Sequence, residues 1–490
     1  MSDICQKQRI ECVQALHQSP TQIVAALSGG GTFFLSDLLA VPGGSRTLIE
    51  AAVPYSHESI SNYIGRVPEQ FCCSRTARTL AMTAFYHARK VIRCEELRKH
   101  GYVDIERVSP KTVDISHDID GITESAIIRS TDFVEPSHIG EIDPYQHILG
   151  IGCTASLVTG RQKMGEHRVY VALQTMYQTI QFSLRLQKNA RTRLEEERLV
   201  ADLILNAVET ARQETEKYLS AQLNQKLPHS NLESKKTHHS ALLEELSSDY
   251  PLYERVKLPL KPGEVVLGEL VTASPLLVDL FFGKLGAILW TNGSTRQSVA
   301  RADMASSEII LDSDSEVSQA IFPGSFSPIH KGHLEMINIA EKRLGKPVVL
   351  EISVQNVDKP PIDYIDLERR LTQIARAKPD QAVWLTQTPL FLEKAELFQS
   401  TTFVVGADTI KRFSNLRFYQ ENVNKFHDIL RTIAYYNCRF LVFARQSKTG
   451  LESLETLSIP DMLRSLCEDV PPSVFTMNIS SSDLRREETQ

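Results

Sequence analysis

A chain of 490 residues, 23% of them charged, is long enough for two or three soluble domains of ordinary composition. Its net charge of −6 excludes a general attraction to nucleic acid or anionic membranes, so we expect neither as a partner and expect bound phosphate to be recognised by local groups. The eight cysteines show no C-x-x-C spacing, and the start "MSDICQKQRI" lacks the apolar core of a signal peptide, which indicates a cytoplasmic chain. Whether the chain forms a homo-oligomer stays open.

The first part of the chain begins with a strand, a glycine-rich loop and a helix. "TQIVAAL" is a short apolar run, "SGGGT" follows it, and "FFLSDLLAV" has helical spacing. Two later apolar runs, "ILGIGCTASLVTG" and "HRVYVAL", predict strands. The stretch from about 184 to 225 has no Pro or Gly and predicts a long closing helix. We therefore expect an α/β domain over residues 1–225.

A polar segment, "KLPHSNLESKKTHHS", follows and has little to bury, so we place a domain boundary near residues 226–240. "GEVVLGELV" and "AILW" predict strands that patterning alone assigns to neither domain, and residues 226–316 stay an unassigned segment. The apolar window "ASPLLVDLFFGKLGAILW" carries Asp279 and Lys284, which are costly at the centre of a bilayer. We expect core packing there instead of a membrane span.

The next domain, residues 317–490, opens with "SQAIFP" as a strand, "LEMINIAEKRL" as a helix and "PVVLEISV" as a strand. In such a βαβ unit a ligand binds beyond the carboxyl ends of the strands. His330 and His333 stand there, where the loop becomes a helix whose free amides carry positive partial charge. Gly324 lets the backbone approach a ligand closely. This arrangement favours a polyphosphate.

Later segments of the same domain add candidate nucleotide contacts. "TTFVVGADT" ends in Gly406 and Asp408, which could hold a ribose hydroxyl, and "FLVFAR" ends in Arg445, which could hold a phosphate. "NISSSDLRR" places a serine run before a basic helical turn, whose amides could bind a second phosphate. Taken singly, each of these three segments can also be interpreted as an ordinary structural feature: a turn glycine, a surface arginine or a helix cap.

Together "GSFSPIHKGH", "GADT" and "ISSSDLR" resemble the nucleotidyltransferase superfamily with the HxGH signature, and specifically the nicotinamide and nicotinate mononucleotide adenylyltransferases. The resemblance implies a Rossmann-like, doubly wound fold, small-molecule nucleotides as partners, and ATP with Mg²⁺ as substrate. It implies no permanently bound cofactor and no metal ligands from the protein. In that family the two histidines contact the ATP phosphates. The other residues that the resemblance implies are Arg485, Ser481 and Ser482 on the triphosphate, Gly324, Ser325 and Phe326 near the nucleotides, and Lys359 as a further phosphate contact.

The acceptor that would receive the nucleotidyl group stays open. The family usually has a tryptophan shortly after its Gly-x-Asp motif, which stacks on the pyridine ring, and "GADTIKRFSNLRFYQ" has none. Phe413, Phe418 and Tyr419 are the candidates to replace it. Pantetheine phosphate or another phosphorylated head group is an alternative acceptor, for an adenylyl- or cytidylyltransferase. A nucleotide sensor or scaffold without turnover is the alternative function.

The first domain resembles the CinA-type domain that deamidates nicotinamide mononucleotide, on "ALSGGGTFFLSDLLAVPGGS", "PYSHES" and "GIGCTASLVTG". The resemblance implies a pocket formed by Ser28, Gly29, Gly30 and Tyr55. Ile60 stands where that family has a lysine, and a serine without a base stays protonated and is a poor nucleophile. We therefore expect the amidase activity to be lost or altered, leaving a domain that is structural or binds phosphate at its glycine loop.

Overall fold

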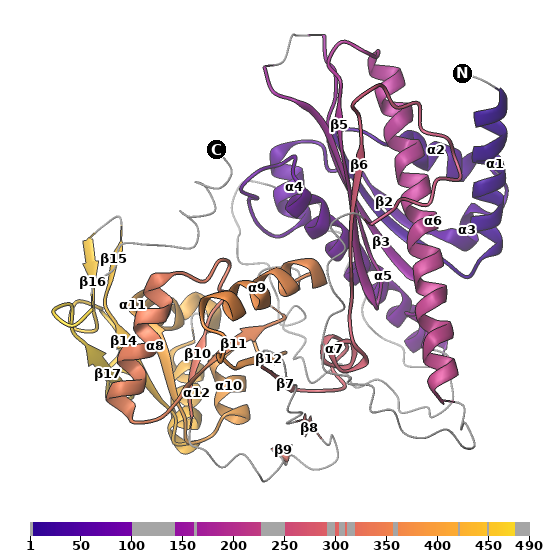
Figure 1. Cartoon of the computed structure of the whole chain (residues 1–490). Coiled ribbons are helices and arrows are strands. Elements are labelled where there is room, and N and C mark those ends of the chain that lie inside the picture. The colour runs from indigo at the N-terminus through magenta and orange to yellow at the C-terminus, as the bar shows by residue number, and fades with distance from the viewer. Residues whose placement is uncertain are drawn as a thin grey trace. The chain divides into compact units, whose positions relative to one another are not determined.

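The computed structural model describes residues 3–99, 143–160, 164–226, 250–291, 299–302, 309–310, 319–355, 361–419, 422–447 and 450–475. The chain forms two compact units, which are described separately (Figure 1). We call Met1–Thr237, Leu243–Ala273 and Asp358–Ile365 the N-terminal unit, and His238–Leu242, Ser274–Val357 and Asp366–Gln490 the C-terminal unit.

The N-terminal unit is built on a mixed six-stranded sheet. Its elements are α1 (Asp3–Gln18), β1 (Gln22–Ser28), α2 (Phe33–Ala40), α3 (Gly44–Thr47), β2 (Leu48–Ala52), α4 (His57–Tyr63), α5 (Ser74–Lys99), β3 (Ile148–Ser156), β4 (His167–Gln174), β5 (Gln178–Leu186), α6 (Arg193–Lys226) and β6 (Val266–Thr272). The strand order is β2-β1-β3-β4-β5-β6. The β1 strand pairs in parallel with β2 and β3, whereas β3 to β6 pair in antiparallel fashion. The α/β class expected from the sequence is confirmed.

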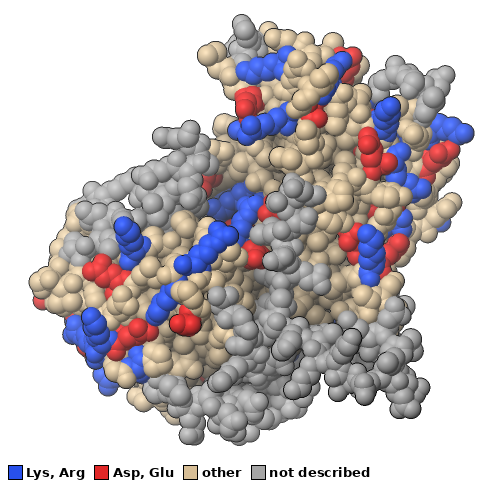
Figure 2. All heavy atoms as spheres, in the orientation of Figure 1, with Lys and Arg blue, Asp and Glu red and all other residues tan. Residues whose placement is uncertain are grey.

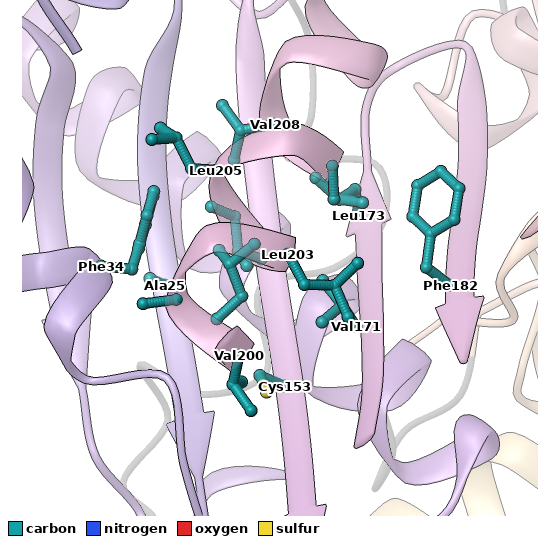
Figure 3. Packing of buried hydrophobic residues seen from close by; sticks show 14 of the residues in the cluster. Ala25, Phe34, Cys153, Val171, Leu173, Phe182, Val200, Leu203, Leu205 and Val208 are labelled. Atoms are coloured by element: carbon teal, nitrogen blue, oxygen red, sulfur yellow. The ribbon is translucent and has the colours of Figure 1, made fainter. Parts of the chain in front are cut away.

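One face of this sheet is covered by α1, α2 and α6, which contribute to a single apolar cluster with the strands. Figure 3 shows Leu203 of α6 near Val171 and Val200 of α6 beside Cys153, and all four residues are fully buried. Burial of such side chains stabilises the fold by roughly 1.5–3 kcal/mol each. The predicted closing helix therefore completes the core of the unit.

The opposite face of the sheet receives α5 at very short range. A Cβ on Gly152 of β3 would lie 2.0 Å from the Ala77 carbonyl oxygen, and one on Gly150 would lie 2.2 Å from that of Ala81. Only glycine leaves room for the helix backbone at these two positions. The glycines of the "GIGC" run are thus explained by helix packing.

The start of the long helix was predicted too early in the chain. Residues 184–186 belong to β5, and α6 begins only at Arg193. The apolar residues Ile180, Phe182 and Leu184 stand at every second position and belong to the core cluster, and this alternation is typical of a strand. No Gly or Pro separates the run "QTIQFSLRL" from the helix pattern.

The segment that the sequence left unassigned is divided between the two units. "GEVVLGELV" contributes β6, which pairs with β5 at the edge of the N-terminal sheet. "AILW" forms β7, which pairs with a strand of the C-terminal sheet. The polar segment after residue 226 lies outside the described residues up to Tyr250.

The C-terminal unit is built on a nine-stranded sheet. Its elements are α7 (Pro275–Phe281), β7 (Ala287–Trp290), β8 (Val299–Ala302), β9 (Ile309–Ile310), β10 (Ala320–Pro323), α8 (Lys331–Leu344), β11 (Val348–Ser353), α9 (Tyr364–Ala377), β12 (Val383–Thr386), α10 (Phe391–Leu397), β13 (Thr402–Gly406), α11 (Ala407–Phe413), the 3₁₀ helix η3 (Leu416–Tyr419), α12 (Val423–Tyr435), β14 (Arg439–Phe443), β15 (Arg445–Ser447), β16 (Gly450–Glu452), α13 (Asp461–Ser465) and β17 (Cys467–Val470). β15 and β16 form a separate ribbon.

The strand order of this sheet is β17-β14-β13-β10-β11-β12-β7-β8-β9, and the strands from β17 to β12 are parallel. The chain proceeds from β10 outward through β11 and β12, then crosses to the other side of β10 for β13 and β14. Such a reversal defines a doubly wound sheet, and ligands bind beside the reversal point. The sheet agrees with the expected Rossmann-like fold.

The apolar window around α7 packs inside the protein, since Leu277, Leu280 and Phe281 are buried. Among the described residues, every helix is too short or too polar to cross a membrane. Figure 2 shows basic and acidic side chains on the same face of the molecule. That mixture agrees with the modest net charge.

A buried ion pair fixes the short segment 361–365 within the N-terminal unit. Arg78 of α5 is 2% exposed, and its Nε donates to Asp363 Oδ1 at 3.0 Å, while its Nη1 donates to Gln181 Oε1 at 2.5 Å. Tyr364 follows, donating from its backbone N–H to Thr179 Oγ1 (3.0 Å) and from its hydroxyl to the Met176 carbonyl (2.7 Å).

Arg78→Met should destabilise the N-terminal unit by about 3–5 kcal/mol, because it leaves the buried Asp363 carboxylate without this partner. Thermal and urea unfolding of the full chain measure the loss. Arg75→Met, which breaks a partly exposed pair with Glu69, is the matched control and should cost less than about 1 kcal/mol. Equal losses in the two variants would contradict the role given to burial.

Candidate functional site

Two loops of the C-terminal unit open at the same edge of the sheet, where the strand order reverses. The β10 strand ends at Pro323 and leads through a loop into α8, and β13 ends at Gly406 and leads directly into α11. The two strands are parallel neighbours, so their carboxyl ends lie side by side. Parallel α/β sheets bind their ligands at this edge.

The two predicted histidines stand together at the start of α8. His330 is the N-cap residue and His333 lies in the first turn, and their rings stack with centroids 3.7 Å apart and planes 23° from parallel. The His330 backbone N–H donates to His333 Nδ1 at 3.2 Å. Because this nitrogen accepts, the neutral His333 ring carries its proton on Nε2, which is left to donate to a ligand.

Burial and positive charge keep both imidazoles neutral. Burial lowers the pKa of His330, and Arg445 lowers it further. Burial lowers the pKa of His333 to about 3, with further contributions from His330 and Arg445. The Arg445 guanidinium disfavours a second positive charge beside it and favours an anion, and a bound polyphosphate would raise the pKa of both histidines again.

The Phe326 side chain packs against the ring of His333. Its side chain is 1% exposed and meets the rings of His333 and Phe322 edge to face at 5.1 Å and 5.3 Å. A Cβ on Gly324 would lie 2.6 Å from the Phe326 ring, so the glycine makes room for that side chain. The sequence placed Phe326 near the nucleotides, but its side chain faces the core, whereas Ser325 in the same loop is exposed.

Arg370 of α9 positions this loop and was missed in the sequence. The side chain is 7% exposed, donates from Nη1 to the Ser325 carbonyl at 2.8 Å and pairs with Asp366 at 2.5 Å. In "YIDLERRLTQIARA" it is one of two adjacent arginines on a helix with an exposed face, and neither its spacing nor its neighbours distinguish it from a solvated charge.

Asp408 and Arg445 meet beyond the ends of β13 and β14. Arg445 Nη1 donates to Asp408 Oδ2 at 2.5 Å, and both side chains are about 40% exposed. A Cβ on Gly406 would lie 2.5 Å from Asp408 Oδ1, so this glycine lets the carboxylate fold back over the strand end. The Arg445 guanidinium is close enough to lower the pKa of both histidines.

Several predicted contacts lie outside the described residues, and the structure places none of them: Lys359, Ser481, Ser482 and Arg485. Within the described ranges, no cluster of three histidine, cysteine, aspartate or glutamate side chains is suited to hold a metal ion. The described site thus consists of the loop from Gly324 to Phe326, the two histidines, Asp408 and Arg445.

The N-terminal candidate pocket is a cavity of about 330 Å³. Its lining residues are Gly29, Gly30, Thr32, Val53, Tyr55, Arg193, Leu194 and Glu197. Ser28 is absent from this lining and is 6% exposed at the end of β1. Ile60 is 3% exposed in an apolar cluster with Ala26 and Leu80. The position expected to supply a base for Ser28 therefore belongs to the core.

A carboxylate occupies the start of α2, where the sequence predicted a phosphate. Glu197 of α6 accepts from the Thr32 backbone N–H at 2.6 Å and from the Thr32 hydroxyl at 2.8 Å. A second anion at this point would face an existing negative charge. This carboxylate disfavours an anion at Thr32, and phosphate binding by the glycine loop stays a prediction.

Comparison with known proteins identifies the class of the C-terminal domain. Residues 321–487 match a family model described as cytidylyltransferase-like, so this part of the chain is a nucleotidyltransferase-like domain. The chain also resembles a phosphopantetheine adenylyltransferase from Prochlorococcus marinus (strain MIT 9301), with 44% identity over 54 residues. These residues are 11% of this chain and 32% of that enzyme, so the chain matches about a third of the relative's length.

The lowered pKa of His333 predicts an acid-sensitive fold. An unfolded histidine titrates near 6.5, so the unfolded chain takes up this proton first as the pH falls. The contribution of a neutral His333 to stability is complete above about pH 6.5 and is lost progressively toward the folded-state pKa of about 3. As the pH is lowered from about 7 to about 5, the free energy of unfolding of His333→Asn should therefore fall less than that of the wild type.

Urea unfolding of the full chain, followed by a probe in the C-terminal unit, measures this difference. His427→Asn, at a histidine of α12 in the same unit, is the control for the substitution itself. Identical profiles for wild type and His333→Asn would contradict the assignment.

Proposed function

We propose that the C-terminal unit transfers a nucleotidyl group from ATP to a phosphate monoester and releases pyrophosphate. The observation that carries the proposal is the stacked pair His330 and His333. The two rings lie at the start of α8, beside the point where the strand order reverses, and Arg445 contributes to the lowered pKa of His333. The similarity of residues 321–487 to cytidylyltransferase-like domains supports the same reaction class.

In this reaction an oxygen of the acceptor phosphate attacks the α-phosphorus of ATP. The bond from that phosphorus to the bridging oxygen breaks, and pyrophosphate leaves with the bonding electrons. Such a displacement needs no covalent nucleophile, because positioning of two anions and stabilisation of the charge in the transition state supply the rate enhancement.

The described residues suit these tasks. His333 Nε2–H can donate to a phosphate oxygen, and the field of a bound triphosphate raises the pKa of both histidines toward the charged form. We assign Arg445 to the phosphates and Asp408, its partner, to a ribose hydroxyl. Mg²⁺ would enter as part of the ATP substrate, and no protein ligands are assigned to it.

Two acceptors are proposed. The motif resemblance favours nicotinamide or nicotinate mononucleotide, which needs an aromatic side chain to stack on its ring. Phe413 and Tyr419 lie in the core, with the Tyr419 hydroxyl donating to the Phe413 carbonyl, so neither presents a ring face. Phe418 is half-buried beside Arg412 and Arg417 and is the remaining candidate. The local similarity to a phosphopantetheine adenylyltransferase favours phosphopantetheine, which has no such ring.

His333→Ala should lower kcat by roughly 10²-fold or more while leaving the fold intact, because it removes a group that acts in the transition state. Pyrophosphate release from ATP and each acceptor measures the rate, and circular dichroism checks the fold. His427→Ala is the matched control. A folded His333→Ala with the wild-type rate would remove the pair from the mechanism.

A panel of acceptors with wild type and Phe418→Ala separates the substrates. If a pyridine mononucleotide is the acceptor, Phe418→Ala should raise its KM by roughly 10-fold, which is the scale of one stacking contact. If phosphopantetheine is the acceptor, the substitution should leave its KM unchanged. ATP binding without pyrophosphate release for any acceptor would favour a nucleotide sensor over an enzyme.

A further inference from the structure

The loop between β10 and α8 contains a residue with a strained backbone. Phe326 has a φ of +43°, in the left-handed region that residues with a Cβ adopt only at a cost in free energy. Its ring is 1% exposed and meets the rings of Phe322 and His333 edge to face. Such a conformation persists only where the surrounding contacts hold it. A relaxed Phe326 backbone would carry the ring away from His333.

Arg370 supplies a contact on the main chain next to Phe326. Its Nη1 donates at 2.8 Å to the carbonyl of Ser325, the residue before Phe326. The hydrogen bond therefore fixes the planar peptide group that joins the two residues. The orientation of this peptide plane sets the φ of Phe326, so Arg370 holds the main chain in the strained conformation while burial holds the ring.

The Arg370 guanidinium is itself held in place. Its Nη2 donates at 2.5 Å to Oδ2 of Asp366, which lies one turn earlier on α9, and the Arg370 side chain is 7% exposed. The planar fork of an arginine holds a carboxylate and a carbonyl at the same time, which the single ammonium group of a lysine does not reproduce. Asp366, Arg370 and Ser325 all belong to the C-terminal unit.

We propose that Arg370 is a positioning residue for the transfer reaction: by holding the Ser325–Phe326 peptide group, it keeps the Phe326 ring against His333 and so fixes the plane of that imidazole. The inference rests on the proposed function, which places His333 at the phosphates. The causes that lower the pKa of His333 are burial, His330 and Arg445, and Arg370 is not among them. Arg370 therefore acts on the imidazole through the loop.

Arg370→Met in the full chain tests this role by its effect on turnover. Pyrophosphate release is measured with ATP and nicotinamide mononucleotide, and with ATP and phosphopantetheine. The substitution should lower kcat roughly 10- to 100-fold and change the KM for ATP little, because it misplaces a group that acts in the transition state. Arg376→Met, at an exposed arginine in the last turn of α9, is the matched control. A folded Arg370→Met with the wild-type kcat would overturn the proposal.

The NMR titration of the His333 ring gives a readout that does not depend on turnover. Burial, His330 and Arg445 lower the pKa of this ring to about 3 in the wild type. If the Phe326 ring moves away in Arg370→Met, water reaches the imidazole and its pKa should rise toward about 6.5. An unchanged titration would exclude the positioning role. Absence of turnover in the wild type would refute the proposed function, while the titration still decides whether Arg370 holds His333.

Should Arg370→Met not fold, Arg370→Lys decides. Lysine keeps a positive charge beside Asp366 and loses the fork that also holds the Ser325 carbonyl. A lower kcat together with a raised pKa of His333 would support the proposal. Wild-type values of both would exclude it.

Discussion

The hydrogen bond from the His330 backbone to His333 Nδ1 is the contact on which the candidate transfer site depends. It joins the last residue of a loop to the first turn of a helix, so the geometry of the loop and the orientation of the ring are set together. Phe326 packs under His333, and Arg370 fixes the loop through the Ser325 carbonyl. The imidazoles are thus oriented before any ligand arrives, which lowers the entropic cost of aligning them.

The two units carry the same local arrangement, a strand followed by a glycine-containing loop and a helix, with opposite chemistry at the helix start. In the C-terminal unit two imidazoles and Arg445 surround the start of α8. In the N-terminal unit the start of α2 is capped by Glu197, a residue 165 positions further along the chain from Thr32. A loop pattern therefore indicates where a ligand can approach, while residues distant in sequence decide the charge that it must carry.

This difference explains how much the sequence could predict. The histidine pair and the strand ends at Asp408 and Arg445 were predictable, because short-range patterns place them at the carboxyl edge of a parallel sheet. Arg370 and Glu197 were not, since each acts through a tertiary contact and looks in sequence like a surface charge on a helix. The β5 strand was missed because its alternating pattern runs into a helix pattern without a Gly or Pro between them.

The path of the chain limits how the protein can be divided. Residues 358–365 belong to the N-terminal unit, although the chain on both sides of them belongs to the C-terminal unit. A fragment that starts near residue 317 would carry Asp363 and Tyr364 without Arg78 or Thr179, exposing a buried ring and a buried carboxylate. Recombination of genes at the interdomain segment would therefore separate Arg78 from Asp363 and Thr179 from Tyr364.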